Sequence, residues 1–235
     1  MLKAVIFDFD GVITDSEALH LRAFNQVLAP FGVQFTTQEY YQKYLGLSDK
    51  DCTETLIASN ILHVPASRVE DLLARKKKAY AVLAATEGQI IDGVRPFLKM
   101  LADHKVSLAI CSGALLAEIE ATLNRAGLGS TFPVIVSADQ VSTGKPDPEG
   151  FLLTLRRLNE TNGPVRADEC VVVEDSHWGL EAARAAGMHT LAVTNSYPVD
   201  QLAMADRVVK RLDEVTYEDL VGLCSASVQP PRGRA

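Results

Sequence analysis

The sequence predicts an α/β protein, built on a doubly wound parallel sheet with an all-helical domain inserted near the amino terminus. Two observations support this fold class. Short apolar runs alternate with helical patterns through most of the 235-residue chain, as in proteins whose parallel strands are connected by helices. Residues 15–88 interrupt that alternation and contain helical patterns alone.

The strands are expected where Val, Ile and other apolar residues follow one another without interruption. Such runs suit a parallel sheet covered on both faces, because neither side of the strand then meets water. The runs cover residues 3–9, 106–112, 133–138, 170–175 and 188–194.

Helical patterns lie between these runs. In residues 114–127 apolar side chains recur at helical spacing, and Gly127 ends the pattern. Residues 182–187 form a helix of small residues that Gly187 closes. Glycine is favoured at such positions because it tolerates the left-handed backbone that ends many helices.

The inserted helical segment begins directly after the first strand. One apolar stripe consists of Leu21, Phe24, Val27, Leu28 and Phe31, and further helical patterns cover residues 37–45, 49–61 and 66–86. We expect an α/β core from residues 1–14 and 89–224, a helical cap from residues 15–88, and a disordered polar tail over residues 225–235.

The composition is that of an ordinary globular protein with a net charge of −7. This charge argues against nucleic acid or an anionic membrane as a partner. No apolar stretch approaches the roughly 18 residues that span a bilayer, and the amino terminus does not resemble a signal peptide. The four cysteines include no Cys-x-x-Cys pair, which suits a reducing compartment. We expect a cytoplasmic protein that is a monomer.

Polar and charged residues gather where the predicted strands end. Ligands of open parallel sheets bind beyond the carboxyl ends of the strands, so these residues are expected to form one site. They are Asp8 and Asp10 after the first strand, Ser112 and Gly113 after the second, Lys145 beyond the third, and Glu174 and Asp175 after the fourth.

Four carboxylates at one edge require a counter-charge, because like charges resist burial together. Mg²⁺ supplies one, since it prefers oxygen ligands and binds substrate phosphates. Lys145, Ser112 and the Gly113 amide can then hold the oxygens of a phosphoryl group while one carboxylate attacks phosphorus and a neighbouring acid transfers the proton. Ser112 can also simply cap the helix that follows it.

These residues resemble the motifs of the haloacid dehalogenase superfamily. In the family's order, the matching stretches are Asp8-Phe9-Asp10-Gly11-Val12-Ile13-Thr14, Ser112, Lys145 in the stretch GKPDP, and EDSHWG at 174–179. The resemblance implies a Rossmann-like core with a helical cap and Mg²⁺ as cofactor. It further implies Asp8 as nucleophile, Asp10 as general acid and base with its backbone carbonyl on the metal, Asp175 as metal ligand with Glu174 beside it, and Ser112 and Lys145 as phosphoryl ligands.

Asp10 favours phosphoryl transfer, because the name-giving dehalogenases of the superfamily lack the second aspartate. The place of the helical insertion resembles the branch of β-phosphoglucomutases and phosphoglycolate phosphatases. His20, Lys76 and Tyr80 are similar to residues of the mutases, which implies that His20 and Lys76 contact the substrate. The residues alone leave other interpretations open, since Lys76 can snorkel to solvent and His20 can be a packing or hinge residue.

Two differences from the mutases favour a phosphatase. The turn Gly46-Leu47-Ser48-Asp49 ends in an acid where the mutases have a substrate-binding arginine, and Ala114-Leu115-Leu116 stand where the mutases have polar residues. We expect a Mg²⁺-dependent phosphatase that hydrolyses a small phosphorylated metabolite, such as a sugar phosphate, through an aspartyl-phosphate. A phosphomutase is the alternative. A phosphoacceptor signalling domain is a third possibility, which the helical insertion disfavours.

Overall fold

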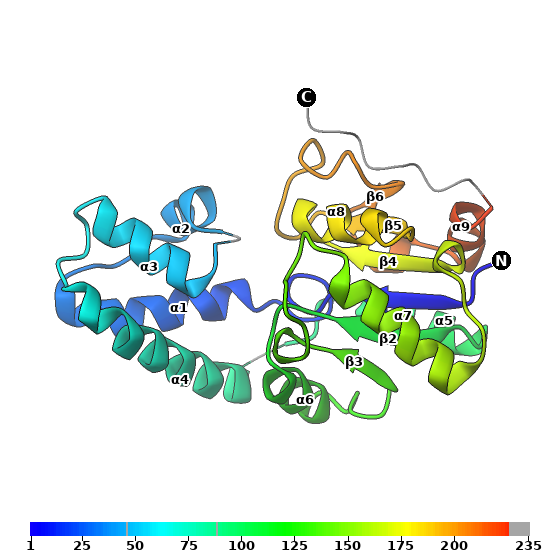
Figure 1. The fold of residues 1–235 in the computed structure, drawn as a ribbon, viewed down its shortest axis with the longest axis horizontal. Coiled ribbons are helices and arrows are strands. Elements are labelled where there is room, and N and C mark those ends of the chain that lie inside the picture. Colours follow the sequence, from blue (N-terminus) through cyan, green and yellow to red (C-terminus); the bar gives the residue numbers. More distant parts are fainter. Residues whose placement is uncertain (46, 88, 226–235) are drawn as a thin grey trace. The chain divides into compact units, whose positions relative to one another are not determined.

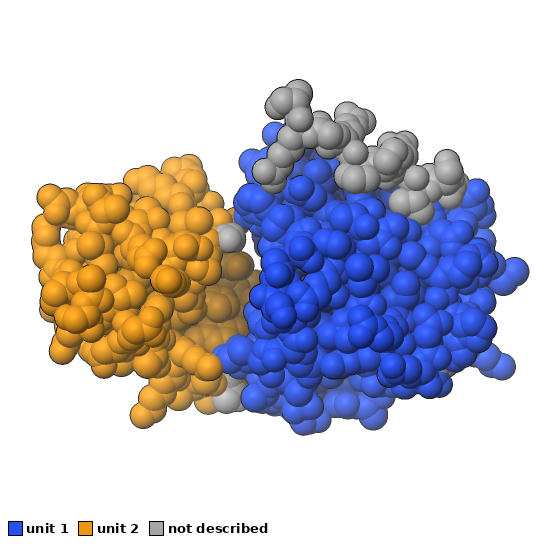
Figure 2. Space-filling view, in the orientation of Figure 1, with its two compact units in different colours: residues 1–14, 89–235 blue, residues 15–88 orange. Residues whose placement is uncertain are grey.

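The computed structural model describes residues 1–45, 47–87 and 89–225, and the chain divides into two units. The sheet unit holds residues 1–14 and the chain from residue 89 onward, and the helical unit holds residues 15–88 (blue and orange in Figure 2). Of the tail expected over residues 225–235, residues 226–235 lie outside the described residues, as does Gly46 of the turn Gly46-Leu47-Ser48-Asp49.

In the described part of the sheet unit, six parallel strands follow the order β3-β2-β1-β4-β5-β6 (Figure 1). Their bounds are β1 (Ala4–Phe7), β2 (Ser107–Cys111), β3 (Val134–Val136), β4 (Cys170–Glu174), β5 (His189–Val193) and β6 (Arg207–Val209). The first five lie within the predicted runs. Strand β6 is not predicted by the sequence pattern, because it has 3 residues and all of them are only partly buried.

Alternate residues of the strands face opposite sides of the sheet, and each side is covered by helices. Val5 and Phe7 pack in one hydrophobic cluster with residues of α5 (Val94–Asp103), α6 (Leu116–Arg125) and α9 (Tyr217–Leu223). Ala4 and Ile6 pack in a second cluster with residues of α7 (Glu149–Asn162) and α8 (His177–Ala185). Short 3₁₀ turns cover Ala138–Gln140, Ala167–Glu169 and Leu212–Glu214. This arrangement confirms the predicted doubly wound α/β fold.

The register of the central strands brings their carboxyl ends to one edge. Phe7, the last residue of β1, pairs with Ile110 in β2 and with Val173 in β4. The backbone N–H of Asp8 continues this ladder and donates to the Val173 carbonyl at 2.9 Å. The residues that follow these three strands therefore emerge together, as expected for a parallel sheet.

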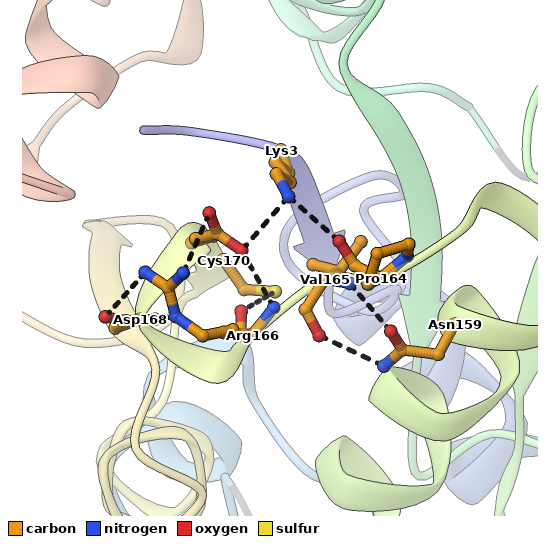
Figure 3. A network of polar contacts seen from close by, with 8 residues as sticks. Lys3, Asn159, Pro164, Val165, Arg166, Asp168 and Cys170 are labelled. Carbon is orange, nitrogen blue, oxygen red and sulfur yellow. Dashed lines mark hydrogen bonds and ion pairs between the residues drawn. The ribbon is translucent and has the colours of Figure 1, made fainter.

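At the amino ends of the strands, a polar network surrounds the segment that leads into β4 (Figure 3). Lys3 Nζ donates to the Pro164 carbonyl at 2.9 Å and lies 3.4 Å from Glu169 Oε2. The amide of Asn159 in α7 makes two hydrogen bonds to the backbone of Val165, at 2.7 and 3.0 Å. These contacts fix the connection from α7 to β4 at the amino ends of the strands.

The helical unit consists, in its described residues, of helices and turns. The helices are α1 (Glu17–Leu28), α2 (Thr37–Lys43), α3 (Asp49–Ala58) and α4 (Val69–Glu87), with 3₁₀ turns at Ala29–Phe31 and Ala66–Arg68. Its core includes Phe24, Leu28, Tyr40, Leu56 and Leu72. The predicted all-helical insertion is confirmed. Among the described helices of the chain, none combines the length and apolar content that crossing a membrane requires.

Candidate active site

Three buried carboxylates meet at the carboxyl edge of the sheet. Asp8 follows β1, Glu174 ends β4, and Asp175 comes directly after it. One oxygen of each side chain lies within 4.8 Å of the others. Strand register explains this convergence, because Asp8 and Glu174 are the residues that follow the paired Phe7 and Val173.

Lys145 reaches the same point from the connection between β3 and α7. Its Nζ donates to Asp8 Oδ1 at 2.8 Å and to Glu174 Oε1 at 2.5 Å, and it lies 5.3 Å from the centroid of the Phe151 ring. Burial acts to lower the pKa of Lys145, but the carboxylates of Asp8 and Glu174 outweigh burial and raise that pKa above its usual value. Lys145 is therefore a permanent cation within the cluster.

One ammonium group does not balance three buried carboxylates. Burial raises the pKa of Asp8 to about 7, against the lowering effect of Lys145 and with a further increase from Glu174. Burial also raises the pKa of Asp175 well above its ordinary value, and the negative charges of Glu174 and Asp8 raise it further. Converging oxygen ligands with excess negative charge are the donor set that Mg²⁺ prefers, so these residues fit the predicted metal.

Glu174 is held in one orientation by donors on both of its oxygens. Oε1 accepts from Lys145, while Oε2 accepts from the N–H groups of Asp175 and Ser176 at 3.0 Å each and from Ser176 Oγ at 2.9 Å. The Ser176 hydroxyl also accepts from the N–H of Gly179 at 3.1 Å and so caps α8. A Cβ at Gly179 would overlap the Glu174 carboxylate, which explains the glycine.

The connection that carries Lys145 is shaped by Glu149, in the first turn of α7. Its carboxylate accepts hydrogen bonds from the N–H groups of Ser142 and Thr143, both at 2.9 Å. The N–H of Glu149 in turn donates to Asp147 Oδ1 at 2.9 Å. Glu149 is not recognisable from the sequence, because its role depends on a loop conformation and not on a motif.

The remaining predicted residues of the sheet unit lie at the same edge. Asp10 is partly exposed in the turn after β1, which the N–H of Gly11 closes by donating to the Thr14 carbonyl at 2.8 Å. Ser112 is buried directly after β2, and its Oγ accepts from the N–H of Ala114 at 3.0 Å. Gly113 is exposed, and a Cβ added to it would meet no atom within 4 Å.

Two residues beyond β5 also touch the site, and neither was predicted from the sequence. The hydroxyl of Ser196 donates to Asp175 Oδ2, and the side-chain amide of Asn195 donates to the Gly11 carbonyl at 2.7 Å. A signal was present, because both follow the fifth predicted strand at its carboxyl end, where the topology places ligands.

The candidate cap residues form a separate polar cluster inside the helical unit. Lys76 is only 2% exposed, which rules out the snorkelling interpretation. Its Nζ lies 2.5 Å from His20 Nδ1 and 2.5 Å from Asp49 Oδ1, and 4.9 and 5.3 Å from the ring centroids of Phe24 and Tyr80. Helices α1, α3 and α4 each contribute to this cluster.

His20 is held uncharged in this cluster. Burial, followed by the charge of Lys76, lowers the pKa of His20 to about 3. Its ring stacks on Tyr80 with the centroids 4.0 Å apart. Since an ammonium group can only donate, His20 Nδ1 accepts from Lys76.

Comparison with known proteins gives one consistent family. A family model described as haloacid dehalogenase-like hydrolase matches residues 5–193. A phosphorylated carbohydrates phosphatase of Thermotoga maritima is 33% identical over 194 residues, which cover 81% of this chain and 84% of the relative. A β-phosphoglucomutase of Bacillus subtilis is 27% identical over 221 residues, which cover 92% of this chain and 93% of the relative.

A solved structure supports the same family. The crystal structure of CbbY from Rhodobacter sphaeroides in complex with phosphate superposes with a TM-score of 0.81 at 26% identity, covering 94% of this chain and 100% of that chain. The family model spans most of the sequence, and the matched proteins include sugar phosphatases and phosphomutases. The chain therefore belongs to the haloacid dehalogenase-like hydrolase family, in the helical-cap branch expected from the place of its insertion, and it is a phosphoric monoester hydrolase.

Proposed function

We propose that this chain is a Mg²⁺-dependent phosphatase that hydrolyses a small phosphorylated metabolite, such as a sugar phosphate, through an aspartyl-phosphate on Asp8. One observation carries the proposal: the buried carboxylates of Asp8, Glu174 and Asp175 converge on one another, and the ammonium group of Lys145 binds two of them. This arrangement supplies both a nucleophile and a place for a divalent cation.

The substrate phosphoryl group is bound by Lys145, Ser112 and the Gly113 amide. Lys145 has three N–H groups, and its contacts with Asp8 and Glu174 use two of them. The third is available, among the described residues, for a phosphoryl oxygen. Held by the carboxylates of Asp8, Glu174 and Asp175 and the Asp10 carbonyl, Mg²⁺ would neutralise negative charge on the transferred group.

Asp8 then attacks phosphorus in line with the leaving group. The bond between phosphorus and Asp8 forms as the bond to the ester oxygen breaks, and Asp10 donates its proton to the leaving alcohol. The deprotonated Asp10 next removes a proton from the water molecule that attacks the aspartyl-phosphate. Inorganic phosphate leaves, and both aspartates return to their starting states.

The choice of a phosphatase over a mutase rests on the helical unit and on the loop after β2. Asp49 pairs with Lys76 at 2.5 Å, so this cation already has a carboxylate partner and is less able to hold a second phosphate. The apolar residues Ala114, Leu115 and Leu116 follow Ser112. The Thermotoga relative, named as a phosphatase of phosphorylated carbohydrates, supports the same choice.

A phosphomutase is the second candidate, because the β-phosphoglucomutase relative covers nearly the whole chain. The two activities differ in their product, since a mutase interconverts sugar phosphates while releasing little inorganic phosphate. The hydrolase family gives no support to a phosphoacceptor signalling domain.

We assign catalysis to the sheet unit and substrate selection to the helical unit, with His20 and Lys76 as its candidate substrate residues. A cytoplasmic location and a monomeric state remain predictions. All four cysteines are free thiols, which is compatible with a reducing compartment. Light scattering on the purified protein measures the oligomeric state directly.

The test is a panel of sugar phosphates and one aryl phosphate, assayed with Mg²⁺ and with a chelator. We expect inorganic phosphate to be released only with Mg²⁺. The variant Asp8→Asn should abolish turnover, while the exposed Asp103→Asn, a matched substitution at the end of α5, should leave it unchanged. After acid quenching during turnover, the wild-type peptide that contains Asp8 should carry the mass of a phosphoryl group.

Two results would refute the proposal. Turnover by Asp8→Asn close to that of the wild type would exclude Asp8 as the nucleophile. Full activity in the chelator would exclude a requirement for Mg²⁺. Interconversion of sugar phosphates without phosphate release selects the mutase instead.

A further inference from the structure

Asp175 is held differently from the other two carboxylates of the cluster. Lys145 binds Asp8 and Glu174. The carboxylate of Asp175 instead accepts a hydrogen bond on Oδ2 from the hydroxyl of Ser196. Asp175 is only 4% exposed, so this contact is made away from bulk water, where a hydrogen bond to a charged group is stronger.

Ser196 belongs to a segment, residues 194–196, in which each residue donates a hydrogen bond to another part of the sheet unit. The N–H of Thr194 donates to the Val209 carbonyl in β6 at 3.1 Å. The amide of Asn195 donates to the Gly11 carbonyl at 2.7 Å, and Ser196 holds Asp175. The segment therefore connects the edge strand, the turn after β1 and the residue after β4.

The turn, the carboxylate and the hydroxyl are packed closely. Gly11 has a φ of +74°, and a Cβ on it would overlap Asp175 Oδ2 and lie 2.9 Å from Ser196 Oγ. No side-chain carbon fits between these groups. Asp175 consequently has little freedom to turn, because the Gly11 backbone confines it on one side while Ser196 binds one of its oxygens.

We propose that Ser196 is a positioning residue for Asp175, holding Oδ2 so that Oδ1 is directed to the metal ion, and that Asn195 supports this by fixing the Gly11 turn. The proposal rests on the proposed Mg²⁺ site. A ligand whose orientation is already fixed loses less conformational entropy when it binds an ion, so hydrogen-bond partners of metal ligands strengthen metal binding.

The test measures Mg²⁺ binding rather than catalysis. Calorimetric titration gives the dissociation constant, and the fluorescence of Trp178 gives a second reading, because it is the only tryptophan and lies three residues after Asp175. We expect Ser196→Ala to weaken Mg²⁺ binding by about 10-fold or more. Ser196→Thr keeps the hydroxyl and should restore most of the affinity, and Asn195→Ala should weaken binding less than Ser196→Ala.

A matched control lies at the start of β5, the strand that precedes Ser196 in the chain. The Thr190 hydroxyl donates to Asp206 Oδ2 at 3.0 Å, near the start of β5. Thr190→Val removes this hydroxyl–carboxylate bond and should lower thermal stability without changing the affinity for Mg²⁺. If the hydrogen bond from Ser196 served only folding, Ser196→Ala would behave like Thr190→Val, with a lower thermal stability and an unchanged affinity for Mg²⁺.

The outcomes separate this inference from the proposed function. If the wild-type protein neither binds Mg²⁺ nor hydrolyses the aryl phosphate, both fail. If it does both, and Ser196→Ala binds Mg²⁺ as the wild type does, only the positioning role is lost. Equal weakening in Ser196→Ala and Thr190→Val, or in Ser196→Ala and Ser196→Thr, also overturns it.

Discussion

Two glycines, Gly11 and Gly179, leave the space that the carboxylates of this site occupy. Gly11 leaves room for Asp175 and Ser196, and Gly179 leaves room for Glu174. Both glycines stand where the backbone approaches an acidic side chain closely. Their role is steric, because any β-carbon would displace a group whose position determines the chemistry.

Gly179→Ala is expected to impair catalysis without preventing folding. Alanine favours a helix by about 1 kcal/mol over glycine, but its methyl group would overlap the Glu174 carboxylate and displace the partner of Lys145. A misplacement of this kind costs about 100-fold in rate. Measuring kcat with the aryl phosphate checks the prediction.

Gly222→Ala in α9 is the control, because a Cβ there meets no atom within 4 Å. This variant should keep full activity and melt at the same or a higher temperature. Equal kcat values for the two alanine variants would show that the packing around Glu174 does not matter for catalysis.

At the scale of elements, the helical unit depends on a polar cluster around the buried side chain of Lys76, which joins α1, α3 and α4. Asp49 and His20 take the place of water around the buried ammonium group of Lys76. Removing a partner of the buried Lys76 costs more than an exposed ion pair contributes, because the charge of Lys76 then loses its compensation. The cluster therefore makes the packing of these helices sensitive to protonation.

The stability of the protein should fall in mild acid because of His20. Its pKa is lowered to about 3 in the folded protein, whereas in the unfolded chain it is close to the ordinary value of about 6.5. As the pH falls below that value, the unfolded state binds a proton that the folded state does not. The free energy of unfolding then decreases by at most about 1.4 kcal/mol per pH unit until the pH approaches the folded pKa.

Urea unfolding between neutral pH and pH 4.5 measures this dependence. His20→Gln should show a flatter profile than the wild type. His63→Gln, which replaces an exposed histidine of the same unit, should keep the wild-type slope. Identical profiles for all three proteins would contradict the assignment of the acid sensitivity to His20.

At the scale of the whole molecule, the acidic cluster links metal binding to folding. Asp8 lies far along the chain from Glu174 and Asp175, and the three carboxylates converge only in the folded state. An ion that binds the folded state alone stabilises it, by about 2.7 kcal/mol when its concentration is 100 times the dissociation constant.

Mg²⁺ is therefore expected to raise the melting temperature above the value measured in a chelator. Asp175→Asn should lose most of this increase, since it removes a charged ligand, while Asp103→Asn should keep it. Scanning calorimetry with and without Mg²⁺ provides the measurement. A melting temperature that is the same in Mg²⁺ and in chelator would argue against the metal site.

The sequence predicted more of the sheet unit than of its loops. The five predicted runs of apolar residues contain β1 to β5, and the acids that follow β1 and end β4 converge because these two strands are paired in parallel register. Strand β6 escaped prediction, since a short edge strand that is only partly buried carries little apolar signal. Ser196 and Asn195 follow the fifth run at its carboxyl end, but they were not singled out, because a polar loop residue has no periodic pattern.

The local order of residues by itself determined the fold class, the family and the acidic strand ends, because strand periodicity and motif spacing are properties of neighbouring residues. Only the tertiary structure decided that Ser196 holds Asp175, that Asp49 and His20 hold Lys76, and that Gly11 and Gly179 stand against carboxylates. Most of these contacts join segments far apart in the chain, and packing, rather than local pattern, brings such segments together. The contact of Gly179 with Glu174 is local but depends on how the turn between β4 and α8 folds.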